Sequence, residues 1–128
     1  MEEREEADRL SHQVIGAAIE VYRCLGPGLL ESAYQACLYR ELALREVPFE
    51  CQVALPVVYK GLAIDNAYRL DVVVGRLVIV ELKSVEEIHP VHEAQLLTYL
   101  RLTGLWLGLL INFNVPTLKQ GIRRLVSG

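Results

Sequence analysis

One short apolar run constrains the fold of this chain more than any other feature. Leu77-Val78-Ile79-Val80 follows a Gly75-Arg76 turn and leads directly into charged residues. An aliphatic run with no polar residue on either side of the pleat is typical of a strand that is buried on both faces. The sequence therefore predicts a central strand, with other elements packed on both sides of its sheet.

Helical and extended patterns surround this strand. Three segments repeat apolar residues at helical spacing: residues 8–25, 29–45 and 91–103. Three more have strand character: residues 49–59, 62–74 and 106–113. We expect an interruption of the second of these near Asp65-Asn66, and a short amphipathic helix from Thr117 to Val126. The predicted fold class is α/β, a mixed sheet with a central hairpin flanked by helices.

Length and composition limit the organisation and the surroundings of the chain. At 128 residues it is the size of one domain, so we predict a single domain over 1–128, with residues 1–8 flexible. No apolar run is long enough to span a bilayer, and the acidic first residues resemble no targeting peptide, which predicts a cytoplasmic protein. Its three cysteines are expected to be buried thiols in a reducing compartment. A net charge of −3 gives no overall attraction to a polyanion.

The first candidate site residues stand at the end of the predicted central strand. Glu81 and Lys83 are two residues apart, so their side chains lie on the same face. Charged groups at the end of a buried strand are costly to desolvate unless they are paired or bound to something. A simple ion pair where the strand reaches the surface is the alternative interpretation.

Asp71 strengthens the functional interpretation. It lies on the preceding strand, and a hairpin loop centred on Arg76 would place it opposite Glu81 on the same face. A two-residue turn would instead place it opposite Val80, so the argument requires a loop with an odd number of residues or a bulge. Two facing carboxylates repel each other, and a divalent cation such as magnesium or manganese would reconcile them.

Three motifs resemble those of a known nuclease group. Asp71 followed by Glu81-x-Lys83 resembles the signature of the PD-(D/E)XK nuclease superfamily, and Gln95-x-x-x-Tyr99 resembles the motif of its RecB-like branch. Gly28-x-x-Glu31-x-x-Tyr34 is similar to the motif of the GxxExxY family within that superfamily. The resemblance covers about residues 11 to 124. It implies a restriction-endonuclease-like core and hydrolysis of phosphodiester bonds in nucleic acid, with DNA the expected substrate.

The resemblance also implies roles for individual residues. Asp71, Glu81 and Glu31 would bind Mg²⁺ or Mn²⁺ together with the Leu82 carbonyl, and Lys83 would orient the attacking water or offset charge. Supporting roles fall to Tyr34, Gln95 and Tyr99. Glu31 has an alternative role at the start of its helix, where a carboxylate is favoured by the helix dipole. Tyr34 could equally be a core residue, and Gln95 and Tyr99 could satisfy core hydrogen bonds.

Other interpretations remain beside the nuclease. The first is a catalytically silent module that binds nucleic acid or protein, and the second is a carboxylate hydrolase acting on another substrate. His89, His92 and Glu93 match no strong zinc pattern. Because the domain is small, we expect a homodimer or a partner protein, and no membrane contact. Candidate phosphate contacts are the basic residues Arg69, Arg76, Arg101, Lys119, Arg123 and Arg124.

Overall fold

The protein is built on one mixed five-stranded sheet. A computed structural model describes residues 2–128, apart from the side chains of Asn66 and Ala67. The strand order is β1-β2-β3-β4-β5, and only the β3–β4 pair is parallel. The strands are β1 Phe49–Tyr59, β2 Leu62–Val74, β3 Val78–Lys83, β4 Leu107–Asn112 and β5 Ile122–Val126. This arrangement confirms that the apolar run forms the central strand.

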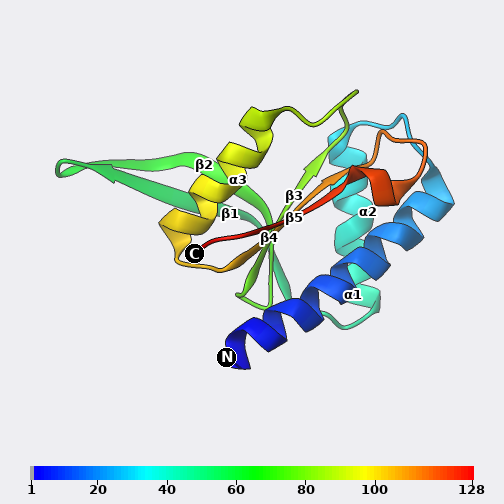
Figure 1. Ribbon diagram of the computed structural model, residues 1–128, viewed down its shortest axis with the longest axis horizontal. Coiled ribbons are helices and arrows are strands. Elements are labelled where there is room, and N and C mark those ends of the chain that lie inside the picture. The colour runs from blue at the N-terminus through cyan, green and yellow to red at the C-terminus, as the bar shows by residue number, and fades with distance from the viewer. Residues whose placement is uncertain (1) are drawn as a thin grey trace.

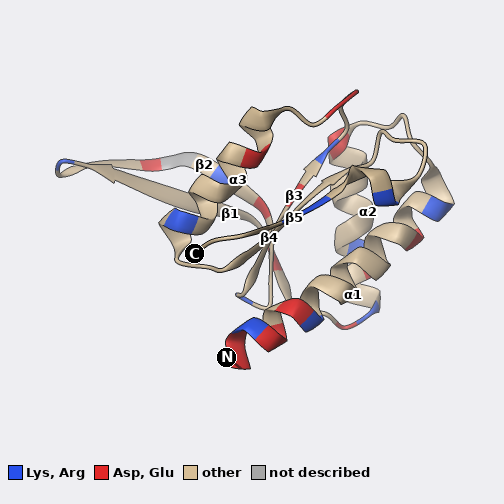
Figure 2. Cartoon of the chain, in the orientation of Figure 1, with Lys and Arg blue, Asp and Glu red and all other residues tan. Residues whose placement is uncertain are grey.

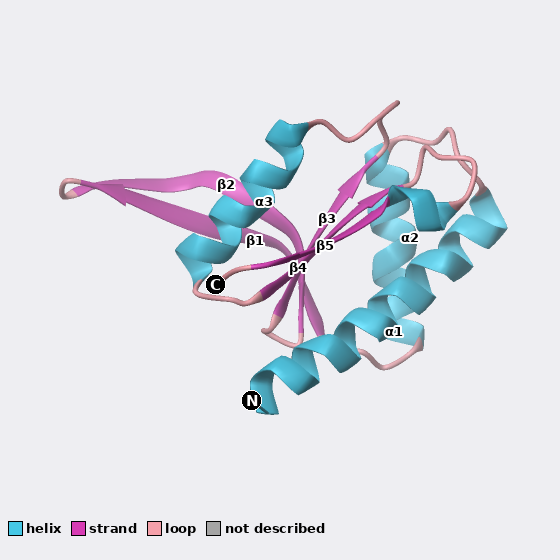
Figure 3. Ribbon diagram, in the orientation of Figure 1, coloured by secondary structure: helices cyan, strands magenta, loops and turns pink. Residues whose placement is uncertain are grey.

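Helices cover both faces of the sheet, as Figures 1 and 3 show. Helices α1 (Glu2–Leu25) and α2 (Glu31–Leu44) pack on one face, and α3 (Pro90–Thr103) covers the other. Side chains alternate along β3, so that Val78 and Val80 join the α1–α2 core while Ile79 joins the α3 core. Within residues 2–128, no helix carries an apolar stretch sufficient to cross a membrane.

The first helix begins earlier than predicted. We expected a start near residue 8 after a flexible segment, whereas the described residues are helical from Glu2 onward. Ala7 is buried in the core, and the Arg4 guanidinium lies 5.0 Å from the centre of the Trp106 ring. These tertiary contacts explain the additional turns, because a strongly charged segment gives no apolar stripe from which to predict them.

The prediction of a helix at the C-terminus was wrong. A short 3-10 turn, Leu118–Gly121, leads into strand β5, which pairs antiparallel with β4. Leu118, Ile122 and Leu125 are spaced as in a helix, but β4 offers an open edge whose backbone groups need partners. The turn requires a glycine, because a Cβ atom at Gly121 would lie 2.0 Å from the Asn112 carbonyl oxygen.

Strands β1 and β2 form a long hairpin that extends beyond the end of α3 (Figure 1). Their pairing shifts between Leu55 and Val57. The interruption predicted near Asp65-Asn66 is a shift in pairing and not a break, because β2 is continuous from Leu62 to Val74. Closer to the centre of the sheet, Gln52 has a φ of 51°, a left-handed conformation that is rare in a strand. The register of the flanking residues places Gln52 across from Asp71.

The β2–β3 loop consists of Gly75, Arg76 and Leu77, since Val74 pairs with Val78. Gly75 and Arg76 both have positive φ, and the Leu77 amide donates to the Val74 carbonyl. Two left-handed residues in succession give the tight turn that suits the twist of a hairpin. The loop therefore has the odd number of residues that the candidate site requires.

Substituting Gly75 by alanine should lower the free energy of unfolding. A Cβ atom there would lie 2.5 Å from Cδ1 of the buried Leu10, so overpacking of about 1–3 kcal/mol adds to about 1–2 kcal/mol for a left-handed residue. Gly61→Ala is the matched control, because Gly61 also has positive φ but no atom within 4 Å of its Cβ position. Denaturant unfolding should show a larger loss for Gly75→Ala, and equal losses would contradict the packing argument.

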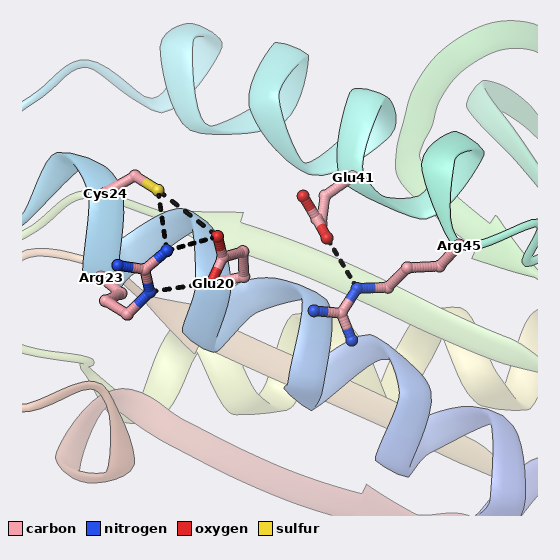
Figure 4. Close-up of polar contacts among 5 residues, drawn as sticks. All are labelled: Glu20, Arg23, Cys24, Glu41 and Arg45. Carbon is pink, nitrogen blue, oxygen red and sulfur yellow. Dashed lines mark hydrogen bonds and ion pairs between the residues drawn. The ribbon is translucent and has the colours of Figure 1, made fainter.

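The cysteines are not buried as predicted. Cys24 and Cys51 are exposed, Cys37 is half-buried, and all three are free thiols. Figure 4 shows Cys24 at the end of α1, beside the Glu20–Arg23 ion pair. Its sulfur lies 3.6 Å from a Glu20 carboxylate oxygen. Cys24 is therefore exposed among polar side chains at the end of a helix, a position that composition alone could not predict.

Candidate active site

Two carboxylates occupy a gap between β2 and β3. The ladder between these strands ends at Val72 and Val80, and the same register one step further brings Asp71 to Glu81. There the Asp71 amide donates to Glu81 Oε2 at 3.1 Å, and the Leu82 amide donates to Asp71 Oδ2 at 2.8 Å. Each carboxylate thus accepts a hydrogen bond from the backbone of the opposite strand. The two acidic side chains lie together, as the hairpin register predicted.

Burial makes this pair of like charges unfavourable. The exposed fraction of Glu81 is only 7%, and Asp71 is half-buried. Loss of hydration, followed by the charge of Asp71, raises the pKa of Glu81 to about 9. At neutral pH the pair therefore holds a proton in the metal-free protein. Buried hard oxygen atoms that must share a proton are a donor set that fits a divalent cation.

Glu31 and Lys83 lie near the C-terminal end of β3. Glu31 is the first residue of α2, and Ser84 Oγ donates at 2.5 Å to the Leu29 carbonyl just before that helix. Loss of hydration, followed by the charge of Lys83, lowers the pKa of His92, whereas the charge of Glu31 opposes this shift. The charge of Lys83 also opposes the rise in the pKa of Glu81. Within the described residues, however, no three His, Cys, Asp or Glu side chains are close enough to hold a metal ion together.

Tyr34 is a core residue that holds the segment before Glu31. Its ring is fully buried and stacks on Phe113, with 4.3 Å between the ring centres. Its hydroxyl donates to the Gly26 carbonyl at 2.6 Å and accepts from the Leu29 amide at 3.2 Å. The tyrosine of the G-x-x-E-x-x-Y motif therefore has a structural function, and its glycine, Gly28, supplies a left-handed backbone with a φ of 100° in the same turn. They fix the turn from which Glu31 starts its helix.

Gln95 and Tyr99, the two polar residues predicted on α3, differ in their exposure to solvent. Tyr99 is buried, and burial, with the charges of Glu81, Tyr68 and Asp71, raises its pKa. Gln95 is exposed one turn earlier. Strand alternation puts the carboxylate pair on the face that α3 covers, so Tyr99 lies on the same side of the sheet as the pair.

Comparison with known proteins agrees with this geometry. The family model described as the PD-(D/E)XK nuclease superfamily matches residues 8–125. The chain belongs to the PD-(D/E)XK nuclease superfamily. Searches of curated proteins and of solved structures find no match. The mixed sheet with its central hairpin, flanked by helices, is the restriction-endonuclease-like fold of this superfamily.

Two residues that support this PD-(D/E)XK site were missed in the sequence. The hydroxyl of Tyr39, on α2, donates to the Asp71 carbonyl at 2.7 Å and accepts from Gln52 Nε2. Asn112, at the end of β4, is 1% exposed; its side chain accepts from the Val85 amide and donates to the Val85 carbonyl. It therefore fixes the loop after Lys83. In the sequence, one signal could have indicated this function of Asn112, namely its position at the end of an apolar run.

The basic residues of this superfamily member do not form one surface. Figure 2 shows Lys and Arg distributed over several elements and interspersed with acidic residues. Arg124 pairs with Asp8 at 2.8 Å, and Arg76 lies 3.7 Å from Glu50. Arg69 donates to the Gln52 carbonyl. Four candidate phosphate contacts have no ion pair within residues 2–128: Arg69, Arg101, Lys119 and Arg123.

Proposed function

We propose that this protein is a divalent-cation-dependent nuclease that hydrolyses phosphodiester bonds of DNA. The observation that carries the proposal is the buried pair of carboxylates, Asp71 and Glu81, held side by side between two strands. A structural role alone gives no reason to bury like charges together, whereas a cation offsets their repulsion. The G-x-x-E-x-x-Y motif favours the GxxExxY family within the superfamily, and a cytoplasmic location stays a prediction.

Asp71 and Glu81 would hold Mg²⁺ or Mn²⁺, with further oxygens from the Leu82 carbonyl and from Glu31. When bound, such an ion polarises the phosphate and lowers the pKa of water. Lys83 would orient the attacking water and offset the negative charge that develops on the phosphate. Tyr39 and Tyr34 hold the Asp71 backbone and the start of the Glu31 helix, and thus keep the acidic groups in position. Gln95 and Tyr99 would support the site from α3.

Cleavage assays test this proposal. The protein is incubated with linear, circular and branched DNA in buffer containing Mg²⁺ or Mn²⁺. Wild type should cut at least one of these substrates, and Lys83→Ala should cut it at least about a hundredfold more slowly, because a group that stabilises transition-state charge contributes on that order. Lys60→Ala is the control, since Lys60 lies at the tip of the hairpin. Equal cleavage by wild type and Lys83→Ala would contradict the proposal.

A catalytically silent module that binds nucleic acid or protein is the second candidate. It is favoured by one observation, that Glu31 does not join Asp71 and Glu81 in a three-residue group able to hold a metal within the described chain. Thermal unfolding separates the two candidates. A nuclease with this site should be stabilised by Mn²⁺, increasingly as the free Mn²⁺ concentration rises above the dissociation constant, whereas a silent module should not.

A further inference from the structure

The outer part of the β1–β2 hairpin exposes apolar side chains that the proposed nuclease activity does not use. We define the arm as residues 57–64, the part beyond the shift in strand pairing. It projects past α3 in Figures 1 and 3. Large apolar residues at and next to the arm are 41 to 69% exposed: Val58, Tyr59, Leu62, Ile64 and Tyr68. A contiguous apolar surface of this kind marks an interaction site.

Most of these side chains share one face of the hairpin. Leu55 pairs with Tyr68 under α3, where Leu55 is buried and the Tyr68 ring lies 6.1 Å from that of Tyr99. Along β1, Val57 and Tyr59 are two and four residues from Leu55, so the same face continues into the arm, and the residues paired with them share that face. We call this continuation the arm face: Val57 paired with Ile64, and Tyr59 paired with Leu62. The core under α3 thus extends into a surface that the helix does not cover.

The charge of the arm indicates the kind of partner. Residues 53–68 contain one basic and one acidic side chain, Lys60 at the tip and Asp65 near the base. A surface that binds the phosphates of DNA needs an excess of positive charge, which this segment lacks. An apolar face with one charge of each sign can instead be complementary to itself, as a twofold interface requires.

We propose that two copies of this chain associate through their arm faces, with the arms crossing antiparallel about a twofold axis. In this arrangement Lys60 at the tip of one arm lies beside the base of the other, where the partner's Asp65 is the acidic residue of the segment. The arm face with Tyr68 exposes on the order of 500 Å² of apolar surface in each copy. Pairing two such faces removes about 1,000 Å² from water, which is the lower limit for a specific interface.

The arm residues to be substituted are remote in sequence from the carboxylate pair. Leu62 is nine residues from Asp71 along β2, about 30 Å in a fully extended strand. A dimer would therefore carry two separate sites in one particle. For the same reason, substitutions in the arm can be tested without altering the candidate active site.

Sedimentation velocity of the full chain over a range of concentrations tests the association. Wild type should form dimers, and the double variant Tyr59→Glu with Leu62→Glu should raise the dissociation constant at least about a hundredfold, because buried aromatic anchors dominate such interfaces. Val58→Glu is the matched control, since Val58 lies on the opposite face of the same arm and is 69% exposed. Circular dichroism checks that every variant is folded.

Charge exchange tests the antiparallel crossing. Lys60→Glu should weaken association severalfold, and adding Asp65→Lys should restore it. Four results would overturn the proposal. Wild type could stay monomeric at every concentration, or Val58→Glu could raise the dissociation constant as much as the double variant does. The double charge exchange could also fail to restore association, or an arm variant could lose DNA binding while wild type remains monomeric. The last result would assign the arm to nucleic acid instead.

Discussion

Replacing Glu81 by glutamine should abolish cation-dependent cleavage of DNA and at the same time raise the melting temperature of the metal-free protein. Activity should fall at least about a hundredfold, because even groups that only orient metal ligands contribute 10–100-fold. Stability should rise because glutamine can still accept from the Asp71 amide through its oxygen, while its amide can donate to the Asp71 carboxylate. Glutamine is neutral without binding a proton, so it removes the free-energy cost of keeping Glu81 uncharged in the folded protein at neutral pH, which should stabilise the fold by about 1–4 kcal/mol, or several degrees.

Glu86→Gln is the control for this prediction. It makes the same chemical change on the exposed loop after β3, and should alter neither cleavage nor melting. The measurements are calorimetry in the presence of a chelator and a cleavage assay in Mg²⁺. A lower melting temperature for Glu81→Gln would mean that Glu81 has a structural function. Unchanged cleavage would exclude Glu81 from the reaction.

Cation affinity should rise steeply with pH. The raised pKa of Glu81, about 9 in the metal-free protein, means that a bound cation must displace a proton at neutral pH. Below that pKa, affinity for Mn²⁺ should increase about tenfold for each pH unit, or about a hundredfold from pH 6 to pH 8. Isothermal titration calorimetry measures both the affinity and the proton released. A flat profile over this range would contradict the shared proton.

The same pKa predicts how the metal-free fold responds to pH. Glu81 binds its proton more tightly in the folded than in the unfolded chain, so its contribution to stability is complete below the ordinary pKa of a glutamate. That contribution decreases as pH rises toward about 9. Unfolding experiments with chelator should therefore show falling stability from about pH 5 to pH 9, and Glu81→Gln should reduce this slope.

Local patterns predicted the central elements of the fold because those elements are constrained locally. The apolar run before Glu81 fits a buried strand, which it forms. Helix α3 ends where Gly104 adopts the left-handed conformation that commonly ends a helix. Strand β5 was not predicted from the sequence, because its extended structure depends on pairing with β4. The spacing of Leu118 and Ile122 fits a helix, and only the open edge of β4 selects the extended form.

The candidate site was predictable to the extent that it depends on register. Asp71 and Glu81 could be placed together from the hairpin alone, once a loop with an odd number of residues was assumed. The contribution of Tyr39 could not be predicted, because its hydroxyl comes from a helix more than thirty residues away in sequence. The neighbourhood of His92, Lys83 and Glu31 likewise depends on how α2 and α3 meet the sheet.

The position of the carboxylate pair depends on how β2 is held against β3. If β2 slid past β3 by one position, Asp71 would lie opposite Val80, and Val72 and Val74 would leave the α1–α2 core that buries them. The apolar side chains near the loop thus keep the two acidic groups in register, so packing at one end of the hairpin is a condition for chemistry at the other.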